Sequence, residues 1–119
     1  MTHSVLETYC LAKEGVIKTF PFDATTVVYK VSTKMFVLSN ISSDIVKINV
    51  KCDPLYALEL RLLYKSIIAG YHMNKKHWNT VTCNQEIEDA LIFEFIDESY
   101  TLVYKGLSKK EKATLAKED

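Results

Sequence analysis

This sequence of 119 residues has few cysteines, glycines and prolines and no long apolar run. Its cysteines, Cys10, Cys52 and Cys83, are odd in number and widely spaced, so neither a disulfide framework nor a zinc ribbon is expected. A composition of 48% hydrophobic and 25% charged residues excludes a disordered tail. The length suffices for one hydrophobic core, which predicts a single domain over residues 1–119.

Targeting and membrane signals are also missing from the sequence. No uncharged run is long or apolar enough to cross a bilayer. The stretch Met1–Cys10 has no basic segment followed by an apolar one, which is the pattern of a signal peptide. We therefore expect a cytoplasmic protein with no membrane partner.

Enzyme and metal signatures are absent as well. No G-x-S-x-G, phosphate-binding loop, G-x-G-x-x-G or H-E-x-x-H motif occurs. On a strand that rises about 3.3 Å per residue, His77 and Cys83 would share a face but lie too far apart to act as base and nucleophile. His72 and His77 have no adjacent carboxylate and no evident third ligand. We expect no catalysis, no cofactor and no metal.

The formal net charge is zero, yet the charges are unevenly distributed. Residues 24–83 contain eight bases and three acids, whereas residues 84–119 contain five bases and nine acids. A polyanion would therefore meet the middle of the chain, provided that folding gathers its lysines on one face.

Helix signals occur at four places along the chain. Ser4 and Glu7 form a capping box, and periodic apolar positions follow it, which predicts a helix from Ser4 to about Lys13. Gly15 fits the left-handed position that ends such a helix. In the second helix, over 55–64, the pattern places Leu55, Leu58 and Leu62 on one side. The other signals are Asp53 and Pro54 as N-cap and first residue of that second helix, Asn84–Lys105 as the longest helix, and a Ser108–Glu111 capping box before a terminal helix.

Strand signals fill most of the remaining chain. In the segment 45–51, Val46, Ile48 and Val50 alternate with Lys47, Asn49 and Lys51, so one face is packed and the other is wet. The expected strands are Val27–Val31 and Met35–Leu38, joined by the turn Ser32–Thr33, then Val46–Val50, and a second hairpin that ends in Trp78–Thr82. Together these elements predict an α+β fold, a mostly antiparallel sheet with flanking helices.

The segment "GYHMNKKHWNTV" over residues 70–81 contains two lysines and two histidines but no Asp or Glu. A hairpin tip of Asn74, Lys75 and Lys76, with His77 and Trp78 behind it, would offer phosphate-binding charge beside aromatic surface. Lys47, Asn49 and Lys51 would add a basic strip. The same residues also fit a solubilising hairpin tip over core aromatics.

Several segments together resemble the MmcQ/YjbR family, and the similarity runs from about Tyr9 to Lys110. They are "FPF", "KMFVL", "NVKCDP", "GYHMNKKHWNTV" and "SYTLVYKGLSKK". The resemblance implies a twisted antiparallel sheet of the frataxin-like or secretion-chaperone-like kind, in bacterial proteins described as DNA-binding with a "double wing" arrangement.

Two functional hypotheses follow. The first is a monomeric, non-catalytic DNA-binding protein whose site comprises Lys47, Asn49, Lys51, His72, Asn74, Lys75, Lys76, His77 and Trp78. The second is an adaptor that binds a protein or a small anion in a polar groove around His72, Asn74 and Trp78.

Overall fold

The computed structural model describes residues 1–70 and 73–117. Within them, four helices and six strands follow one another along the chain. The helices are α1 (His3–Leu11), α2 (Pro54–Leu63), α3 (Asp89–Lys105) and α4 (Lys109–Lys117). The strands are β1 (Val16–Thr19), β2 (Thr26–Val31), β3 (Lys34–Asn40), β4 (Lys47–Lys51), β5 (Ile67–Ala69) and β6 (Trp78–Thr82).

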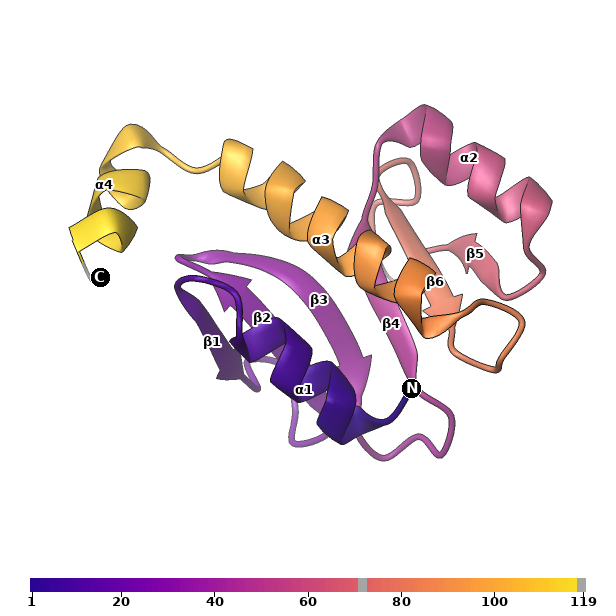
Figure 1. Cartoon of the computed structure of the whole chain (residues 1–119). Coiled ribbons are helices and arrows are strands. Elements are labelled where there is room, and N and C mark those ends of the chain that lie inside the picture. Colours follow the sequence, from indigo (N-terminus) through magenta and orange to yellow (C-terminus); the bar gives the residue numbers. More distant parts are fainter. Residues whose placement is uncertain (71–72, 118–119) are drawn as a thin grey trace.

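The strands form one antiparallel sheet in the order β1-β2-β3-β4-β6-β5. The first four strands make a meander, and β6 then pairs with β4, so that α2 and β5 form an excursion to the far edge of the sheet. Figure 1 shows α1 and α3 lying across one face of this sheet, with α2 beside β5 and β6 and with α4 at the opposite end of the molecule. We call the face under α1 and α3 the covered face, and the other the open face.

The predicted α+β fold and the four predicted strands are confirmed. In β4, Ile48 and Val50 are at most 2% exposed, whereas Lys47 is exposed, as the alternation of side chains predicted. The second predicted hairpin is formed by β5 and β6. Strand β1 was not predicted, because four residues are too few to show a period.

Two of the predicted helix starts were wrong. Helix α1 is capped by Thr2, whose hydroxyl accepts from the Val5 N–H at 3.1 Å, and not by Ser4. Helix α3 begins at Asp89 instead of Asn84. The Asn84 side chain accepts a hydrogen bond from the Ser66 hydroxyl at 2.9 Å, so it ties the chain to the start of β5 before α3 begins.

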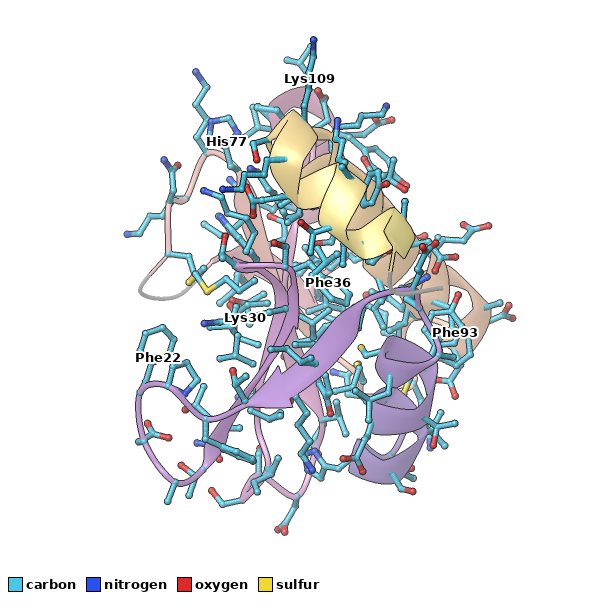
Figure 2. All side chains as sticks on the ribbon, turned by 90° about the vertical axis from the view of Figure 1, so that its left-hand side faces the viewer. Phe22, Lys30, Phe36, His77, Phe93 and Lys109 are labelled. Carbon is cyan, nitrogen blue, oxygen red and sulfur yellow. The ribbon has the colours of Figure 1, made fainter. Side chains whose placement is uncertain are left out.

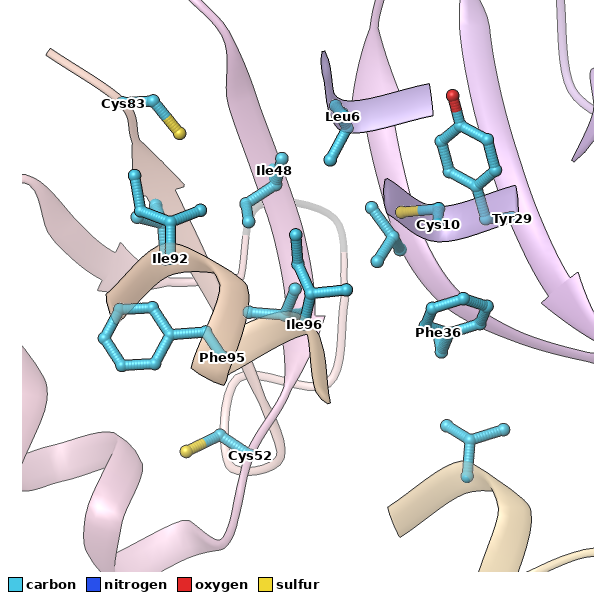
Figure 3. Close-up of a cluster of buried hydrophobic side chains, with 14 of the residues drawn as sticks. Leu6, Cys10, Tyr29, Phe36, Ile48, Cys52, Cys83, Ile92, Phe95 and Ile96 are labelled. Carbon is cyan, nitrogen blue, oxygen red and sulfur yellow. The ribbon is translucent and has the colours of Figure 1, made fainter. Parts of the chain in front are cut away.

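The core lies between the covered face and helices α1 and α3 (Figure 3). Leu6 of α1, Ile48 of β4 and Ile96 of α3 are each at most 1% exposed. Ser99 of α3 is fully buried in the same layer; its hydroxyl donates to the Phe36 carbonyl at 2.6 Å and accepts from the Lys51 N–H at 2.8 Å. This hydroxyl satisfies backbone groups of two strands, so it fixes α3 on the sheet.

Helix α2 packs by a different side from the one that the leucine spacing suggests. Asp53 caps it through the N–H groups of Leu55 and Tyr56, and Pro54 is its first residue, as predicted. Its buried side chains, however, are Ala57 and Leu60, whereas the predicted stripe of Leu55, Leu58 and Leu62 is exposed. Apolar residues occur on both sides of this helix, and the small Ala57 permits the closer approach to the sheet.

Helix α4 begins with the predicted capping box, in which Glu111 accepts from the Ser108 N–H at 3.2 Å and its own N–H donates to the Ser108 hydroxyl at 3.0 Å. The Glu111 carboxylate also accepts from Ser32 at 2.7 Å and from Thr33 at 2.9 Å, in the β2–β3 turn. These hydrogen bonds, that from Ser32 first, lower the pKa of Glu111 to about 2. Glu111 therefore joins the end of the chain to the turn between β2 and β3.

Candidate nucleic-acid interface

The open face carries the predicted strip of Lys47, Asn49 and Lys51. In the β4–β6 register these residues lie beside Thr82, Thr80 and Trp78. The Thr80 hydroxyl donates to the Asn49 side-chain oxygen at 2.6 Å, which holds that carboxamide against β6. The structure therefore brings two lysines and an amide together on the side of the sheet away from α1 and α3.

Charge differs sharply between the two sides of the sheet. The six strands contain five lysines and no acid: Lys18, Lys30, Lys34, Lys47 and Lys51. Helix α3, above the covered face, contains four acids and one base: Asp89, Glu94, Asp97, Glu98 and Lys105. The acids thus gather in the helical layer, and the sheet beneath it is basic.

Ion pairs reinforce this separation. Lys13 pairs with Asp97 and Lys18 pairs with Glu7, each at 2.5 Å, on the covered side. Across residues 1–70 and 73–117, the open-face lysines Lys30, Lys47 and Lys51 have no carboxylate within 4.0 Å. No carboxylate of the described residues therefore competes with an external anion for these ammonium groups.

A turn at residues 74–77 lies beside this face. The Asn74 side-chain oxygen accepts a hydrogen bond from the Lys76 N–H at 3.0 Å. The backbone carbonyl of Asn74 accepts from the N–H groups of His77 and Trp78 at 3.1 and 3.0 Å. Asn74 therefore shapes the turn, while Lys75 and Lys76 are exposed at its tip and His77 is half-buried. Figure 2 shows His77 on the side of the molecule away from Phe93. His72, another predicted site residue, lies outside the described residues.

Trp78 is a packing residue of the open face. Its side chain is only 9% exposed and forms a small cluster with Val28 and Leu38, against which Met35 and Met73 pack. An indole so placed offers little free surface on which a base could stack. It also lines a small hollow of about 250 Å³ with Lys34 and Lys51.

Arg61 of α2 was missed by the sequence analysis, although it holds the 74–77 turn in place. Its Nε donates to the Asn79 side chain at 2.6 Å, and its Nη2 donates to the carbonyls of Lys75 and Trp78, the latter at 3.3 Å. The available signal was that Arg61 is the only arginine of the chain. A planar guanidinium with several fixed donors suits such bridging better than a lysine.

A hollow of about 550 Å³ on the open face was also missed. Apolar side chains of the 20–25 loop, β3 and the residues before the turn line it, with polar side chains of β2, β3 and β4 between them. They are Phe22, Met35, Leu38 and Met73, and Thr26, Ser39, Asn40 and Asn49. Figure 2 shows Phe22, which lines this hollow, on the side of the molecule away from Phe93. The signal in the sequence was the pair of aromatics around Pro21, and Phe22 is 64% exposed.

Cysteine chemistry and metal binding find no support in the described residues. The three cysteines are free and buried, and burial raises the pKa of Cys10 and Cys52 to about 12 and that of Cys83 to about 11. The part of the chain that the structure describes has no group of three or more His, Cys, Asp or Glu placed to hold a metal. No helix in residues 1–70 or 73–117 is long and apolar enough to cross a membrane.

These observations define a small α+β protein whose sheet is covered by helices on one face and is basic on the other. The chain belongs to the YjbR family, whose sequence profile matches residues 11–102. The family resemblance predicted from the sequence is therefore confirmed.

Relatives and solved structures agree with this assignment. The chain is 41% identical over 92 residues to the protein YbdF of Escherichia coli O157:H7, covering 77% of this chain and 75% of YbdF. It is 28% identical over 115 residues to YjbR of Escherichia coli strain K12, covering 97% and 98% of the two chains. Both relatives are described as uncharacterised proteins.

The crystal structure of protein DR2400 of Deinococcus radiodurans superposes with a TM-score of 0.91 at 38% identity, covering 97% of this chain and 88% of that chain. A protein from Pseudomonas syringae superposes with a TM-score of 0.72 at 25% identity, covering 86% of this chain and 98% of the other. The sheet topology described above is thus shared with experimentally solved relatives.

Proposed function

We propose that the protein binds DNA without catalysis, through phosphate contacts made by the open face and the 74–77 turn. One observation carries the proposal: the acids gather over the covered face, while the open-face lysines have no acidic partner among the described residues. Such an arrangement gives a locally positive surface on a chain of zero net charge.

Four lysines supply the phosphate contacts in this proposal. Lys47 and Lys51 act from β4, and Lys75 and Lys76 act from the turn that Arg61 holds. Asn49, His72, Asn74 and His77 would contribute polar contacts, whereas the buried Trp78 supports the surface from below. Contacts of this kind position a protein on DNA without reading its sequence.

The test is the double variant Lys75→Ala and Lys76→Ala. Removing two phosphate contacts should weaken binding to unrelated duplexes about equally and reduce the slope of log affinity against log salt by roughly two units. The matched control is Lys109→Ala with Lys110→Ala, an adjacent exposed pair at the start of α4. Helix α4 lies at the other end of the molecule from α2 (Figure 1).

Fluorescence anisotropy at several salt concentrations measures both quantities. Equal losses of DNA affinity in the two double variants would show that binding depends on total charge and not on this surface. Wild-type protein that shows no salt-sensitive binding would end the proposal.

A second candidate function rests on the hollow beside Met73. Its apolar wall of Phe22, Met35 and Met73 suits a ligand or protein segment with an apolar body, and the Asn49 side chain at the same hollow offers a polar contact. This location differs from the groove expected around His72, Asn74 and Trp78, because neither Asn74 nor Trp78 lines the hollow. Phe22→Ala should weaken the binding of such a ligand and leave the affinity for DNA almost unchanged. Binding to the hollow should also vary far less with salt.

A further inference from the structure

The outward face of α2 consists almost entirely of leucine. Leu55, Leu58, Leu62 and Leu63 are 79, 55, 89 and 64% exposed. The one charged residue on this face is Glu59. Monomeric proteins rarely expose a contiguous apolar patch of more than a few hundred Å². Because Ala57 and Leu60 already anchor α2 to the sheet, these leucines are available to a partner.

The spacing of three of the leucines indicates that the partner is a helix. Leu55, Leu58 and Leu62 are separated by three and then four residues, which is the a-d-a spacing of a coiled-coil seam. Side chains in such a seam insert between the side chains of a facing helix. The surface therefore fits another helix with the same apolar stripe, and α2 of a second copy provides one.

We propose that α2 packs antiparallel against α2 of a second copy of this chain, forming a twofold-symmetric dimer. Charge favours this direction over the parallel one. Asp53 lies at the N-terminal end of α2 and Lys65 lies just beyond its C-terminal end, both exposed. The antiparallel arrangement brings each Asp53 towards Lys65 of the other copy, and it also opposes the two helix dipoles. A parallel arrangement would place the two Asp53 carboxylates together.

A helix of ten residues is about 15 Å long, so this contact is smaller than a standard stable interface. Association should therefore be reversible and should depend on concentration. Glu59 lies near the middle of α2, so the twofold axis brings it close to its own copy. Repulsion between the two carboxylates weakens the dimer, and Glu59→Gln should strengthen it.

Sedimentation equilibrium over a wide range of protein concentration tests the proposal. Wild-type protein should shift from monomer towards dimer as its concentration rises. Leu58→Glu should weaken the dimer roughly tenfold or more, as expected for a central apolar contact. Its melting temperature should stay close to that of wild type, because Leu58 is more than half exposed and Glu is a good helix former.

The matched control is Ile17→Glu, which places the same charge at an apolar residue of similar exposure, 53% against 55% for Leu58, on β1 at the far edge of the sheet. Its association should equal that of wild type. A dimer that Ile17→Glu weakens and Leu58→Glu does not would place the interface elsewhere. Protein that stays monomeric at every concentration would show that the leucines meet another partner and would overturn the proposal.

Engineered cysteines test the direction of the helices, because all three native cysteines are buried. A disulfide requires Cα atoms roughly 4.4–6.8 Å apart. Glu59→Cys, near the twofold axis, should crosslink to itself on mild oxidation. Leu55→Cys should crosslink to a chain with Leu62→Cys and not to itself. Efficient self-crosslinking of Leu55→Cys would show a parallel pair and would refute the antiparallel arrangement.

Discussion

The two faces of the sheet differ in the size of the apolar cluster that they bury and in the pairing of their lysines. The covered face buries a large cluster, from Leu6 of α1 to Ile96 of α3. Two lysines on this side, Lys13 and Lys18, form ion pairs with carboxylates. Within residues 1–70 and 73–117, the buried apolar cluster of the open face comprises three residues around Trp78, and the lysines of this face form no such pairs. Stability is therefore concentrated on one side of the sheet, which leaves the other side able to carry uncompensated charge.

The largest loss of stability is expected when a side chain buried under the helices of the covered face is truncated. Phe36 is fully buried and meets the ring of Tyr100 edge to face, with ring centroids 5.3 Å apart. Phe36→Ala should lower the free energy of unfolding by about 3–5 kcal/mol, because it removes buried surface and leaves a cavity. Urea denaturation measures this loss. A cost below about 1 kcal/mol would show that the core does not depend on this layer.

The same truncation on the open face should cost less. Trp78→Ala removes a larger side chain, but its surroundings are a small cluster beside solvent that can collapse more completely. We expect a loss near 3 kcal/mol, at the lower end for this kind of substitution. If Trp78→Ala costs clearly more than Phe36→Ala in urea denaturation, stability is not concentrated on the covered face.

Ser99 tests the junction between α3 and the sheet. Ser99→Ala removes the hydroxyl that bonds Phe36 and Lys51, so the buried Phe36 carbonyl and the half-buried Lys51 N–H lose this partner. The expected loss is about 2 kcal/mol, within the 1–3 kcal/mol usual for such groups. Thr101→Ala, at an exposed position of the same helix, is the control and should change the free energy of unfolding by less than about 0.5 kcal/mol. Thermal or chemical denaturation that shows equal effects would contradict the role of Ser99.

The smallest effect concerns the pH dependence of stability. The pKa of Glu111 in the folded protein is lowered to about 2, below its value of about 4.3 in an unfolded chain. Its contribution to stability is therefore complete above the unfolded pKa and is lost as pH falls from about 4.3 towards 2. Glu111→Gln should flatten the stability curve in this window.

Thr33→Ala provides a second, finer test of the same contact. It removes one hydrogen bond to the carboxylate, so the pKa of Glu111 should rise part of the way towards its ordinary value. NMR titration of the Glu111 side chain measures this change. A pKa near its ordinary value in the wild-type protein would show that α4 does not hold the β2–β3 turn in solution.

Local patterns in the sequence predicted the alternation in β4 and the caps of α2 and α4, but they placed the starts of α1 and α3 wrongly at Ser4 and Asn84. The alternation around Ile48 placed Lys47 correctly, and the Ser108–Glu111 box marked the start of α4. The buried side of α2 could not be predicted in this way, because leucines occur on both sides of the helix. Only packing against the sheet selects Leu60 as a buried residue. Arg61 was missed for a related reason, since its acceptors are 14 to 18 residues away along the chain.

The path of the chain between β4 and β6 also has a consequence for local motions. The chain leaves β4 at Lys51 and enters β6 at Trp78, and these residues are direct partners in the sheet. A hydrogen bond of 2.8 Å from the Cys52 N–H to the His77 carbonyl closes the base of the intervening segment. Since these two ends meet, α2 and β5 form one unit that can open while β4 stays paired with β6. We therefore expect its amide protons to exchange with solvent together, ahead of those in the central strands.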